Sequence, residues 1–445
     1  MSERIDYDHR YCTLNRGDMV AAYTIQRKIG KGAYCTVYDV TSSDATSNQS
    51  NVAIKIYRAG YSNKDAFNAE LHALIHLNNS ACRINEGFTN IMKYYGYFAH
   101  LAVDITADIT AESLKSSIHP CVIVGKYGDS VDELWHVFSD GLDINNAKRI
   151  FRQLCCGLKY IHRCGIAHGD IKTANILMNK KAEDLLTPQS LHDVEIVISD
   201  FNHSRFISNQ ECETVGTQVY CAPEVMLKLP WSTPADIWSA GCVFYELLTT
   251  NDLFTIEEDS DTELSESTDG MHIDGGTSTS IKASTTTPPK RATDHNSHDD
   301  HNSHNNSHDD NSYDSSDDAN YSSSGGFDPD VVYSHLSGIY QLLGKPPTRF
   351  IKGGRDYYNS KGYLKHNPDL KTVNLREVMT NEFNCPRGVA DSVHEFLLKM
   401  IKYRPEERAT ASALLESKFL RNIEQQTNNT NNTNNTCLLY TSRCV

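Results

Sequence analysis

The sequence predicts an α+β fold of two lobes, a small antiparallel β-sheet lobe with one helix followed by a larger, mainly helical lobe. Between Tyr23 and Phe98, short runs of β-branched and aromatic residues are interrupted by one helix-like segment, KDAFNAELHALIHL. From Asn146 onward, helical spacing of apolar residues dominates, as in AKRIFRQLCCGLKYIHRC and DIWSAGCVFYELL. A strand-rich half followed by a helix-rich half favours two lobes with a cleft between them.

Length and composition indicate a globular protein with polar extensions. The 445 residues suffice for two or three domains, and 39% of them are hydrophobic. A run of about 18 apolar residues, which a membrane span requires, does not occur. The N-terminal stretch MSERIDYDHRYCTLNRGDMV lacks the apolar core of a signal peptide. The 13 cysteines show no paired spacing. We therefore expect reduced thiols and an intracellular location, in the cytoplasm, the nucleus or both.

Most of the net charge of −15 belongs to residues 255–326, which hold 16 acidic against 3 basic residues. This segment is of low complexity and nearly free of large apolar residues. It cannot bury enough surface to offset the loss of chain entropy, and we predict a disordered insert. Its regularly spaced histidines suggest a metal site, but a repetitive polar composition is the simpler explanation. They are His295, His298, His301, His304 and His308.

Both ends of the chain lie outside the predicted fold. From about Gln425 the tail is an Asn/Thr repeat that ends in CLLYTSRCV. These last nine residues resemble a translated sequencing adapter, and we interpret them as an assembly scar. The predicted organisation is an N-terminal extension (1–22), a first lobe with a hinge (23–127), the first part of the second lobe (128–254), the insert (255–326), the second part of that lobe (327–421) and the tail (422–445).

Two motifs in the strand-rich half are suited to binding phosphate groups. IGKGAYCTVYDV places Gly30 and Gly32 in a predicted turn between two strands, where glycine lets backbone N–H groups approach phosphates closely. Alone this signal is weak, because a Gly-x-Gly hairpin is usually only a tight turn. In VAIK, Lys55 lies on a predicted strand, and Glu70 on the following helix is placed to pair with it. Taken alone, two such charges are more often solvated surface residues.

The helix-rich half adds an ordered series of polar motifs. HGDIKTAN supplies a carboxylate at Asp170, an ammonium at Lys172 and an amide at Asn175, and VISDF places Asp200 after an apolar run. Carboxylate and amide oxygens are ligands that Mg²⁺ prefers. A positioned carboxylate can also accept the proton of a hydroxyl. Three motifs follow in order, YCAPEV with Glu224, DIWSAG with Asp236 and ERAT with Arg408. We interpret Glu224 and Arg408 as a buried structural ion pair.

In this order and spacing, these motifs resemble the eukaryotic protein kinase family over about residues 11–420 with the insert removed. The resemblance implies transfer of the γ-phosphate of ATP to a protein hydroxyl, with ATP and Mg²⁺ as cofactors. It assigns Asp170 to accept the hydroxyl proton and Lys172 to the transferring phosphate. Asn175 and Asp200 would hold Mg²⁺. The nucleotide-binding residues that it implies are Ile29, Gly30, Lys31, Gly32, Ala33, Val37, Ala53, Lys55, Glu70, Val124 and Tyr127.

Within the serine/threonine branch, which Lys172 favours, the chain most resembles the SR-protein kinases. The stretches YCTLNRGDMVAAYTIQRKIGKGAYCTVY, HPCVIVGKYG and GIYQLLGKPPTRFIKGGRDYYNSKGYLKH are similar to that group. Its members also lack an Arg before the catalytic Asp, where this chain has Gly169, and they work without phosphorylation of the activation segment. A phosphate added there would gain no charge-assisted contact from position 169. The resemblance implies constitutive activity and Arg/Ser-rich protein substrates.

The chain departs from the family pattern at a few positions. Asn202 replaces the glycine after Asp-Phe, and because Asn tolerates a left-handed backbone, the loop geometry can survive the exchange. Cys221 stands where the subgroup has an Arg. Ser334 and Gln341 are uncharged where the subgroup docks arginine-rich substrates with acidic residues. The acidic insert could replace them as a diffuse attractor, although charge in such segments usually only solvates the chain.

An active protein kinase is the leading interpretation of these motifs. The alternative is a pseudokinase that acts as a nucleotide-binding or scaffolding module, and only Gly169 and Asn202 support it. A small-molecule kinase fits less well, because the peptide-substrate motifs CAPEV and DIWSAG are intact. We expect a monomer that acts on a protein substrate and has neither a membrane nor a nucleic acid as a direct partner.

Overall fold

The computed structural model describes most of the two predicted lobes. The described residues are 11–42, 51–59, 64–79, 86–102, 118–208, 212, 214–254, 321–322 and 326–421. Residues 1–10, nearly all of the predicted insert with its histidines, and the predicted tail lie outside them.

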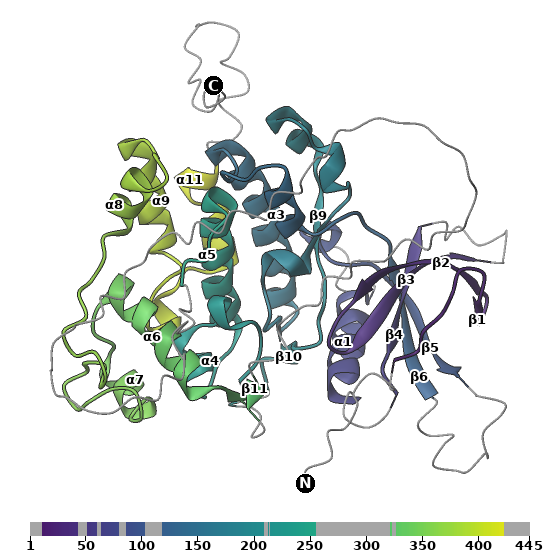
Figure 1. Cartoon of the computed structure of the whole chain (residues 1–445), viewed down its shortest axis with the longest axis horizontal. Coiled ribbons are helices and arrows are strands. Elements are labelled where there is room, and N and C mark those ends of the chain that lie inside the picture. Colours follow the sequence, from purple (N-terminus) through teal and green to yellow (C-terminus); the bar gives the residue numbers. More distant parts are fainter. Residues whose placement is uncertain are drawn as a thin grey trace, which may run out of the picture.

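Six antiparallel strands form the sheet of the smaller lobe, at the right of Figure 1. Their order is β1-β2-β3-β4-β6-β5. β1 lies within the predicted N-terminal extension and joins the sheet at its edge, where Val20 pairs with Tyr23. The strands are β1 (Met19–Val20), β2 (Tyr23–Lys31), β3 (Cys35–Ser42), β4 (Val52–Tyr57), β5 (Tyr94–Leu101) and β6 (Ile118–Gly125).

The side chains of β4 alternate between two apolar clusters, because successive residues of a strand point to opposite faces of the sheet. Val52, Ile54 and Ile56 belong to the cluster on the outer face. Ala53 and Tyr57 belong to the main core. Lys55 stands between these two in the sequence and therefore shares their face, which is the face that α1 covers.

The helix of this lobe, α1 (Lys64–Leu77), coincides with the predicted segment residue for residue. Leu71, Leu74 and Leu77 recur at helical spacing and are buried, and Leu74 and Leu77 belong to the main core. Asp65 in the first turn complements the positive end of the helix dipole. Glu70 is fully buried on this helix, which places a carboxylate against β4.

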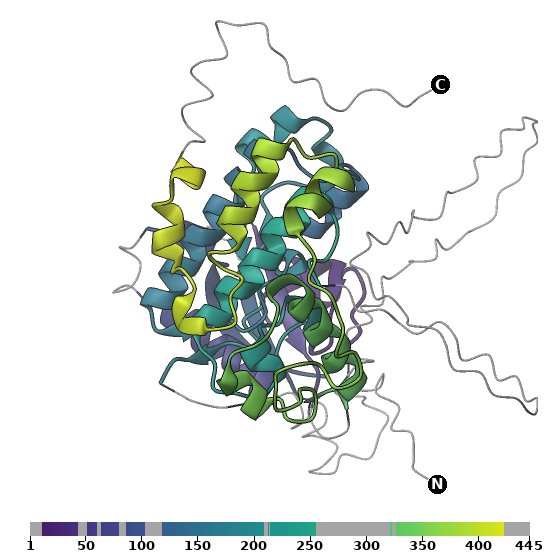
Figure 2. The same ribbon diagram turned by 90° about the vertical axis from the view of Figure 1, so that its left-hand side faces the viewer.

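The larger lobe is mainly helical, and Figure 2 shows it in front of the sheet lobe. Its central helices are α3 and α5, and Asp143 caps α3 by accepting hydrogen bonds from the backbone N–H groups of Asn145 and Asn146. The helices are α3 (Ile144–Arg163), α4 (Pro223–Met226), α5 (Thr233–Thr249), α6 (Pro329–Leu343), α7 (Thr348–Gly353), α8 (Leu375–Asn381), α9 (Arg387–Leu397), α10 (Ala411–Leu415) and α11 (Lys418–Arg421).

Short strands on this lobe flank two loops that contain predicted catalytic and metal-binding residues. β7 (Ile166–Ala167) pairs with β10 (Arg205–Phe206), and β8 (Ile176–Met178) pairs with β9 (Ile196–Ile198). Residues 168–175, which contain the predicted catalytic side chains and are called the catalytic loop below, lie between β7 and β8. The segment with Asp200 connects β9 to β10. A further antiparallel pair, β11 (Tyr321–Ser322) and β12 (Gly326–Phe327), precedes α6.

One apolar cluster runs through both lobes, from Tyr57 and Leu74 to Phe151 and Trp238. The predicted α+β fold with a sheet lobe and a helical lobe is confirmed. Every cysteine in the described ranges is a free thiol, and no helix in those ranges is long and apolar enough to cross a membrane.

The predicted ion pair between Glu224 and Arg408 is also confirmed. Arg408 donates from both terminal nitrogens to the two carboxylate oxygens of Glu224, at 2.6 and 2.7 Å, and both side chains are buried. Removal of either partner would leave a buried charge uncompensated, which typically costs about 3–5 kcal/mol of stability. The pair joins the start of α4 to a loop 184 residues later in the sequence and has a structural role.

Candidate active site

The glycine-rich motif forms the β2–β3 hairpin, but only one of its glycines lies in the turn. Gly30 belongs to β2 and pairs with Val37, contrary to the predicted turn position. Gly32 opens the turn and donates its N–H to the carbonyl of Cys35 at 2.9 Å. Tyr11 donates its hydroxyl to the carbonyl of Gly32 at 2.9 Å, so a residue before β1 contacts the tip of this hairpin. A Cβ added at Gly32 would meet no neighbouring side chain or backbone atom within 4 Å, so the tip has open space on that side.

The other predicted nucleotide-binding residues of this lobe lie on neighbouring strands. Ala53 of β4 pairs with Val124 of β6, and Val37 of β3 pairs with Lys55. Tyr127 follows β6 and accepts the backbone N–H of Lys93 at 3.2 Å. Two more, Ile29 and Ala33, belong to the hairpin, where Ile29 is exposed, and the ammonium of Lys31 lies 4.5 Å from the centre of the Tyr11 ring.

Lys55 joins the two lobes at the candidate site. Its ammonium donates to Glu70 Oε1 at 2.7 Å and to Asp200 Oδ1 at 3.0 Å. Burial by itself lowers the pKa of Lys55, but the charges of Asp200 and Glu70 outweigh burial and raise it, so this lysine stays protonated. Burial acts to raise the pKa of Asp200, and the ammonium of Lys55 outweighs it and lowers that pKa. The pair predicted from spacing alone, Lys55 with Glu70, is therefore a buried contact, in which burial raises the pKa of Glu70.

Asp170 lies at the centre of a dense set of donors. Its Oδ1 accepts the backbone N–H and the hydroxyl of Thr217, both at 2.9 Å. Its Oδ2 accepts Nδ2 of Asn175 at 2.9 Å, and the ammonium of Lys172 lies 3.7 Å from the same oxygen. Asn175 also donates to the backbone carbonyl of Asp170 at 2.8 Å. The catalytic loop thus brings together the three polar side chains that its sequence motif contains.

Thr217 contacts the predicted catalytic residues but was not predicted from the sequence. Its hydroxyl donates to Asp170 and accepts a hydrogen bond from Lys172 at 2.7 Å, so it holds both predicted catalytic side chains. The segment between Asp200 and Glu224 contains other hydroxyl residues, and no local pattern distinguishes the one that reaches the catalytic loop. The others described there include Ser204, Ser208 and Thr214.

Asp236 is hydrogen-bonded to the backbone at the start of the catalytic loop. Its carboxylate accepts the backbone N–H groups of His168 and Gly169, both at 2.9 Å, and the Nε2–H of His162 at 2.8 Å. Burial acts to raise the pKa of Asp236, but the hydrogen bond and charge of His162 outweigh it and lower that pKa. An ionised carboxylate at the start of α5 therefore fixes the backbone next to Asp170.

Gly169 has a steric role that the sequence analysis did not foresee. Its φ is 83°, and a Cβ at this position would lie 2.6 Å from the carbonyl oxygen of His203. Gly216, with a φ of 84°, lies on the other side, where a Cβ would be 2.4 Å from the carbonyl oxygen of Gly169. His203 and Gly216 belong to the segment between Asp200 and Glu224, which is called the activation segment here. This segment therefore packs directly on the backbone of the catalytic loop, and position 169 has no room for an Arg side chain in this arrangement.

The backbone at Asn202 differs from the family-based expectation. The left-handed residue of this loop is Asp200, with a φ of 61°, and Asn202 has no positive φ. Asn202 instead contributes through its side chain, which is buried and bonds to Asp200 and Tyr57. The substitution is accommodated by hydrogen bonding rather than by backbone tolerance.

The oxygen donors fit the binding of Mg²⁺. Both hydrogen bonds to Asp200 engage Oδ1, and no described residue donates to Oδ2. Asn175 uses only its Nδ2 in the described contacts, which leaves the carbonyl oxygen of its amide for a cation. These are the hard oxygen ligands that Mg²⁺ prefers. Among the described residues, no group of three or more His, Cys, Asp or Glu side chains could hold a metal alone, so phosphate oxygens and water would complete the coordination.

The positions associated with substrate recognition are less accessible than the sequence suggested. Cys221 is buried, and burial raises the pKa of its thiol. His335 of α6 lies within hydrogen-bonding distance of the carbonyl of Cys221, at 2.8 Å. Ser334 and Gln341 both lie on α6, and Gln341 is buried. An acidic docking surface for arginine-rich chains is therefore not formed by these two residues.

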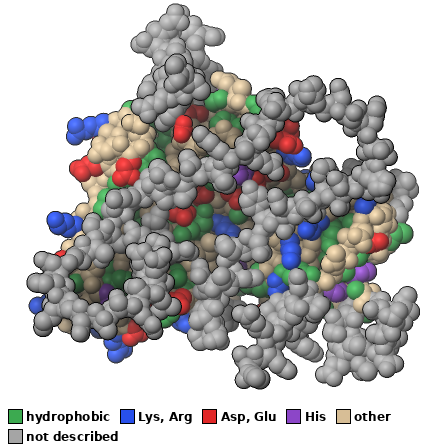
Figure 3. Space-filling model, viewed as in Figure 1, with side chains coloured by type: hydrophobic (Ala, Val, Ile, Leu, Met, Phe, Trp, Pro, Cys, Tyr) green, Lys and Arg blue, Asp and Glu red, His purple; other side chains and the backbone are tan. Residues whose placement is uncertain are grey.

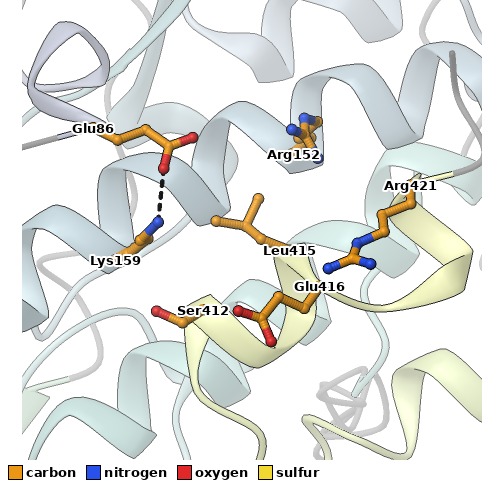
Figure 4. Close-up of a pocket in the computed structure, with 7 residues that line it drawn as sticks. All are labelled: Glu86, Arg152, Lys159, Ser412, Leu415, Glu416 and Arg421. Carbon is orange, nitrogen blue, oxygen red and sulfur yellow. Dashed lines mark hydrogen bonds and ion pairs between the residues drawn. The ribbon is translucent and has the colours of Figure 1, made fainter.

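A separate pocket, drawn in Figure 4, contains none of the predicted site residues. Charged side chains of both signs line it, and Lys159 of α3 pairs with Glu86 at 2.7 Å. On the face shown in Figure 3, acidic and basic side chains of the described residues are interspersed over both lobes. The pocket residues are Glu86, Arg152, Lys159, Ser412, Leu415, Glu416 and Arg421.

The chain is similar in sequence to known protein kinases. The family described as "Protein kinase domain" matches residues 23–420. The serine/threonine-protein kinase SRPK of Physarum polycephalum is 24% identical over 459 residues, which cover 90% of this chain and 86% of that protein. The dual specificity protein kinase lkh1 of Schizosaccharomyces pombe is 27% identical over 58% of this chain, and SRSF protein kinase 3 of Mus musculus is 26% identical over 56%.

The matches to the last two relatives span only 35% and 32% of their own lengths. Among solved structures, the crystal structure of a kinase domain aligns with a TM-score of 0.60 at 19% identity. The alignment covers 93% of this chain and 99% of the other. At this identity the likeness supports the fold.

Proposed function

Because this chain belongs to the protein kinase family, we propose that it transfers the γ-phosphate of Mg-ATP to serine or threonine hydroxyls of protein substrates. The observation that carries the proposal is the convergence of two networks. Lys55 with Glu70 and Asp200 forms one, and Asp170 with Asn175 forms the other. A pseudokinase usually lacks one of these groups, and here each is present and engaged.

The geometry suggests a division of tasks among the side chains. Lys55 would hold the inner phosphates of ATP, since its charge is fixed by two carboxylates. Asp170, aligned by Thr217, would orient the substrate hydroxyl and accept its proton. Lys172 lies close to Asp170 and would neutralise charge on the transferring phosphate. When bound, Mg²⁺ would neutralise phosphate charge, and Asp200 and Asn175 would be its protein ligands.

We further propose that the substrates are Arg/Ser-rich proteins. The support is the similarity to SRPK and to SRSF protein kinase 3, together with the long C-terminal motif GIYQLLGKPPTRFIKGGRDYYNSKGYLKH. The uncharged Ser334 and the buried Gln341 weigh against docking through α6. Contacts to arginine would therefore have to come from elsewhere, and the predicted acidic insert is one candidate.

Constitutive activity is a third part of the proposal. Thr217 orders Asp170 through an unmodified hydroxyl, and Gly169 supplies no cation from position 169 for a phosphate on the activation segment to bind. Treatment with a phosphatase should leave the rate of transfer unchanged. Loss of activity after this treatment would contradict constitutive activity and leave the kinase proposal intact.

Transfer of labelled phosphate from ATP to an Arg-Ser repeat peptide tests the main proposal, with Asp170→Asn as the matched control. We expect labelled peptide from the wild type and almost none from the variant. Binding of nucleotide without transfer would favour the pseudokinase. Equal transfer to a Pro-directed or an acidic-directed peptide would contradict the Arg/Ser-rich substrate class only. The intracellular location and the monomeric state stay predictions.

A further inference from the structure

The amide of Asn202 bridges two side chains that come from different lobes. Its Nδ2 donates to Oδ1 of Asp200 at 2.6 Å, and its Oδ1 accepts the hydroxyl of Tyr57 at 2.9 Å. Asn202 is 7% exposed and Tyr57 is fully buried. The amide orientation follows from its neighbours, because the reverse orientation would set its oxygen against the Asp200 carboxylate.

This bridge closes a ring of side chains around Lys55. The single hydroxyl proton of Tyr57 is shared between Asn202 Oδ1 and Glu70 Oε2, and Glu70 Oε1 accepts from the ammonium of Lys55. That ammonium in turn donates to Asp200 Oδ1, the same oxygen that Asn202 contacts. The carboxylate of Asp200 is thus held by two donors, and one of them depends on Tyr57 for its own position.

The backbone around Asp200 is anchored to the sheet lobe at further points. The N–H of Phe201 donates to Glu70 Oε1 at 3.4 Å. Ser204 donates to the carbonyl of Phe201 at 2.7 Å and lies 3.4 Å from the carbonyl of Ala69 in α1. These contacts matter because Asp200 has a left-handed backbone, which is unfavourable for a residue other than glycine and persists only where its surroundings hold it.

Glycine at position 202, the residue of the wider family, could supply none of the side-chain contacts. Asp at position 202 would replace the amide donor with a second carboxylate, which would repel the carboxylate of Asp200. An amide carries a donor and an acceptor on separate atoms, so Asn202 donates to Asp200 and accepts from Tyr57 at the same time.

We propose that Tyr57 and Asn202 form a positioning pair that holds the carboxylate of Asp200 in place for the metal before nucleotide binds. Tyr57 fixes the amide of Asn202, and the amide fixes Oδ1 of Asp200, so that Oδ2 faces the site. Neither residue touches nucleotide or metal. The inference rests on the proposed function, in which Asp200 is the ligand of Mg²⁺.

The test compares Tyr57→Phe, Asn202→Ala and the double variant in the full chain. The dissociation constant of ADP is measured by calorimetry with and without Mg²⁺, and the kinetic constants for ATP are measured at several Mg²⁺ concentrations. Each single variant should weaken ADP binding in Mg²⁺ by about five- to tenfold, which corresponds to about 1–1.4 kcal/mol, the net contribution of a typical hydrogen bond. ADP binding without Mg²⁺ should be unchanged, and kcat at saturating Mg²⁺ should change by less than about twofold.

The double variant should be no weaker than the weaker-binding single variant, because either change already breaks the same link. Tyr160→Phe is the matched control. Tyr160 is another fully buried tyrosine, and its hydroxyl donates to the carbonyl of Leu77 at 2.6 Å, away from the ring around Lys55. This control should lower Tm and leave the Mg²⁺ dependence of ADP binding unaltered.

Two results would overturn the positioning pair. If Tyr57→Phe and Asn202→Ala lower Tm but leave the Mg²⁺ dependence intact, the two residues are only structural. If the effects of the single changes add in the double variant, the residues do not act through one link. Should Asn202→Ala fail to fold, Tyr57→Phe decides, since it removes a single oxygen atom. Absence of any Mg²⁺ effect on ADP binding by the wild type would overturn the proposed function as well.

Discussion

The two aspartates of the candidate site are held in different ways. Asp170 accepts hydrogen bonds on both oxygens, from Thr217 and Asn175, and is 7% exposed. Asp200 accepts on Oδ1 only, from Lys55 and Asn202, and its side chain is 37% exposed. One carboxylate is surrounded by donors, and the other is held at one oxygen and open at the second.

The difference also concerns where the donors come from. All donors to Asp170 belong to the catalytic loop and the activation segment of the helical lobe. Asp200 depends on Lys55 of β4 and, through Asn202, on Tyr57 of the same strand. A shift of the sheet lobe would therefore disturb Asp200 before Asp170. We therefore expect that mutation can separate the proposed positioning of the substrate hydroxyl from that of the metal.

Asp170→Asn should separate the two carboxylates most clearly. The isosteric amide cannot accept a proton, so kcat should fall by about 10²–10⁴-fold. Binding of ADP in Mg²⁺ should stay within about twofold of the wild type, because the donors to Asp200 are unchanged. Peptide phosphorylation and calorimetry measure the two effects. Asp200→Asn is the counterpart and should weaken binding of Mg-ADP. Equal loss of binding in both variants would contradict separate roles.

Gly169→Ala should disturb the Asp170 network through the backbone. A Cβ would lie 2.6 Å from the carbonyl oxygen of His203, at a residue with a φ of 83°. We expect a loss of about 2–4 kcal/mol in the free energy of unfolding, measured by denaturant titration. Gly388→Ala, in α9, is the control, because a Cβ there meets no atom within 4 Å and should not destabilise. Similar stability of both variants would contradict the close packing at Gly169.

Thr217→Ala should weaken the alignment of Asp170 without changing its charge. The variant loses the hydroxyl that donates to Asp170 and accepts from Lys172. Loss of a hydrogen bond to a charged group predicts a fall in kcat of about 10- to 100-fold, with the affinity for Mg-ADP preserved. Thr217→Ser keeps the hydroxyl and should restore most of the rate. If Ser does not rescue the rate, the hydroxyl is not the group that matters.

Glu246→Gln should have the smallest effect on catalysis, and its main effect should be on how stability depends on pH, because Glu246 contacts the catalytic loop only through Thr173. Burial raises the pKa of Glu246 to about 8, from an ordinary value of 4.5. The folded state therefore retains a proton that the unfolded state loses, and stability declines as pH rises from about 4.5 to about 8. Gln mimics the neutral acid and can keep the contacts to Thr173 and Tyr220.

The variant should lose on the order of 3 kcal/mol less stability than the wild type between pH 5 and pH 8, measured by denaturant titration. Burial raises the pKa of the neighbouring Asp252 to about 6, and this residue contributes in the same direction in both proteins. Parallel pH profiles of the two proteins would show that Glu246 does not titrate in this range.

Much of the candidate site could be predicted from local patterns. The apolar spacing in KDAFNAELHALIHL predicted α1 at its observed bounds, and the ordered motifs located Lys55, Asp170 and Asp200. Thr217 and Tyr57 could not be found in this way. Several hydroxyl residues lie between Asp200 and Glu224, and only the three-dimensional arrangement determines that Thr217 meets Asp170 and that Tyr57 meets Glu70.

The sequence by itself determined the α+β class, the order of the motifs and the chemical groups available for phosphoryl transfer, because these depend on residue type and local spacing. Only the tertiary structure decided the left-handed turn at Asp200 rather than Asn202 and the contact of Asn202 with Tyr57. Tyr57 and Asn202 are 145 residues apart in the chain. A contact over that separation depends on how two lobes pack, which no local pattern encodes.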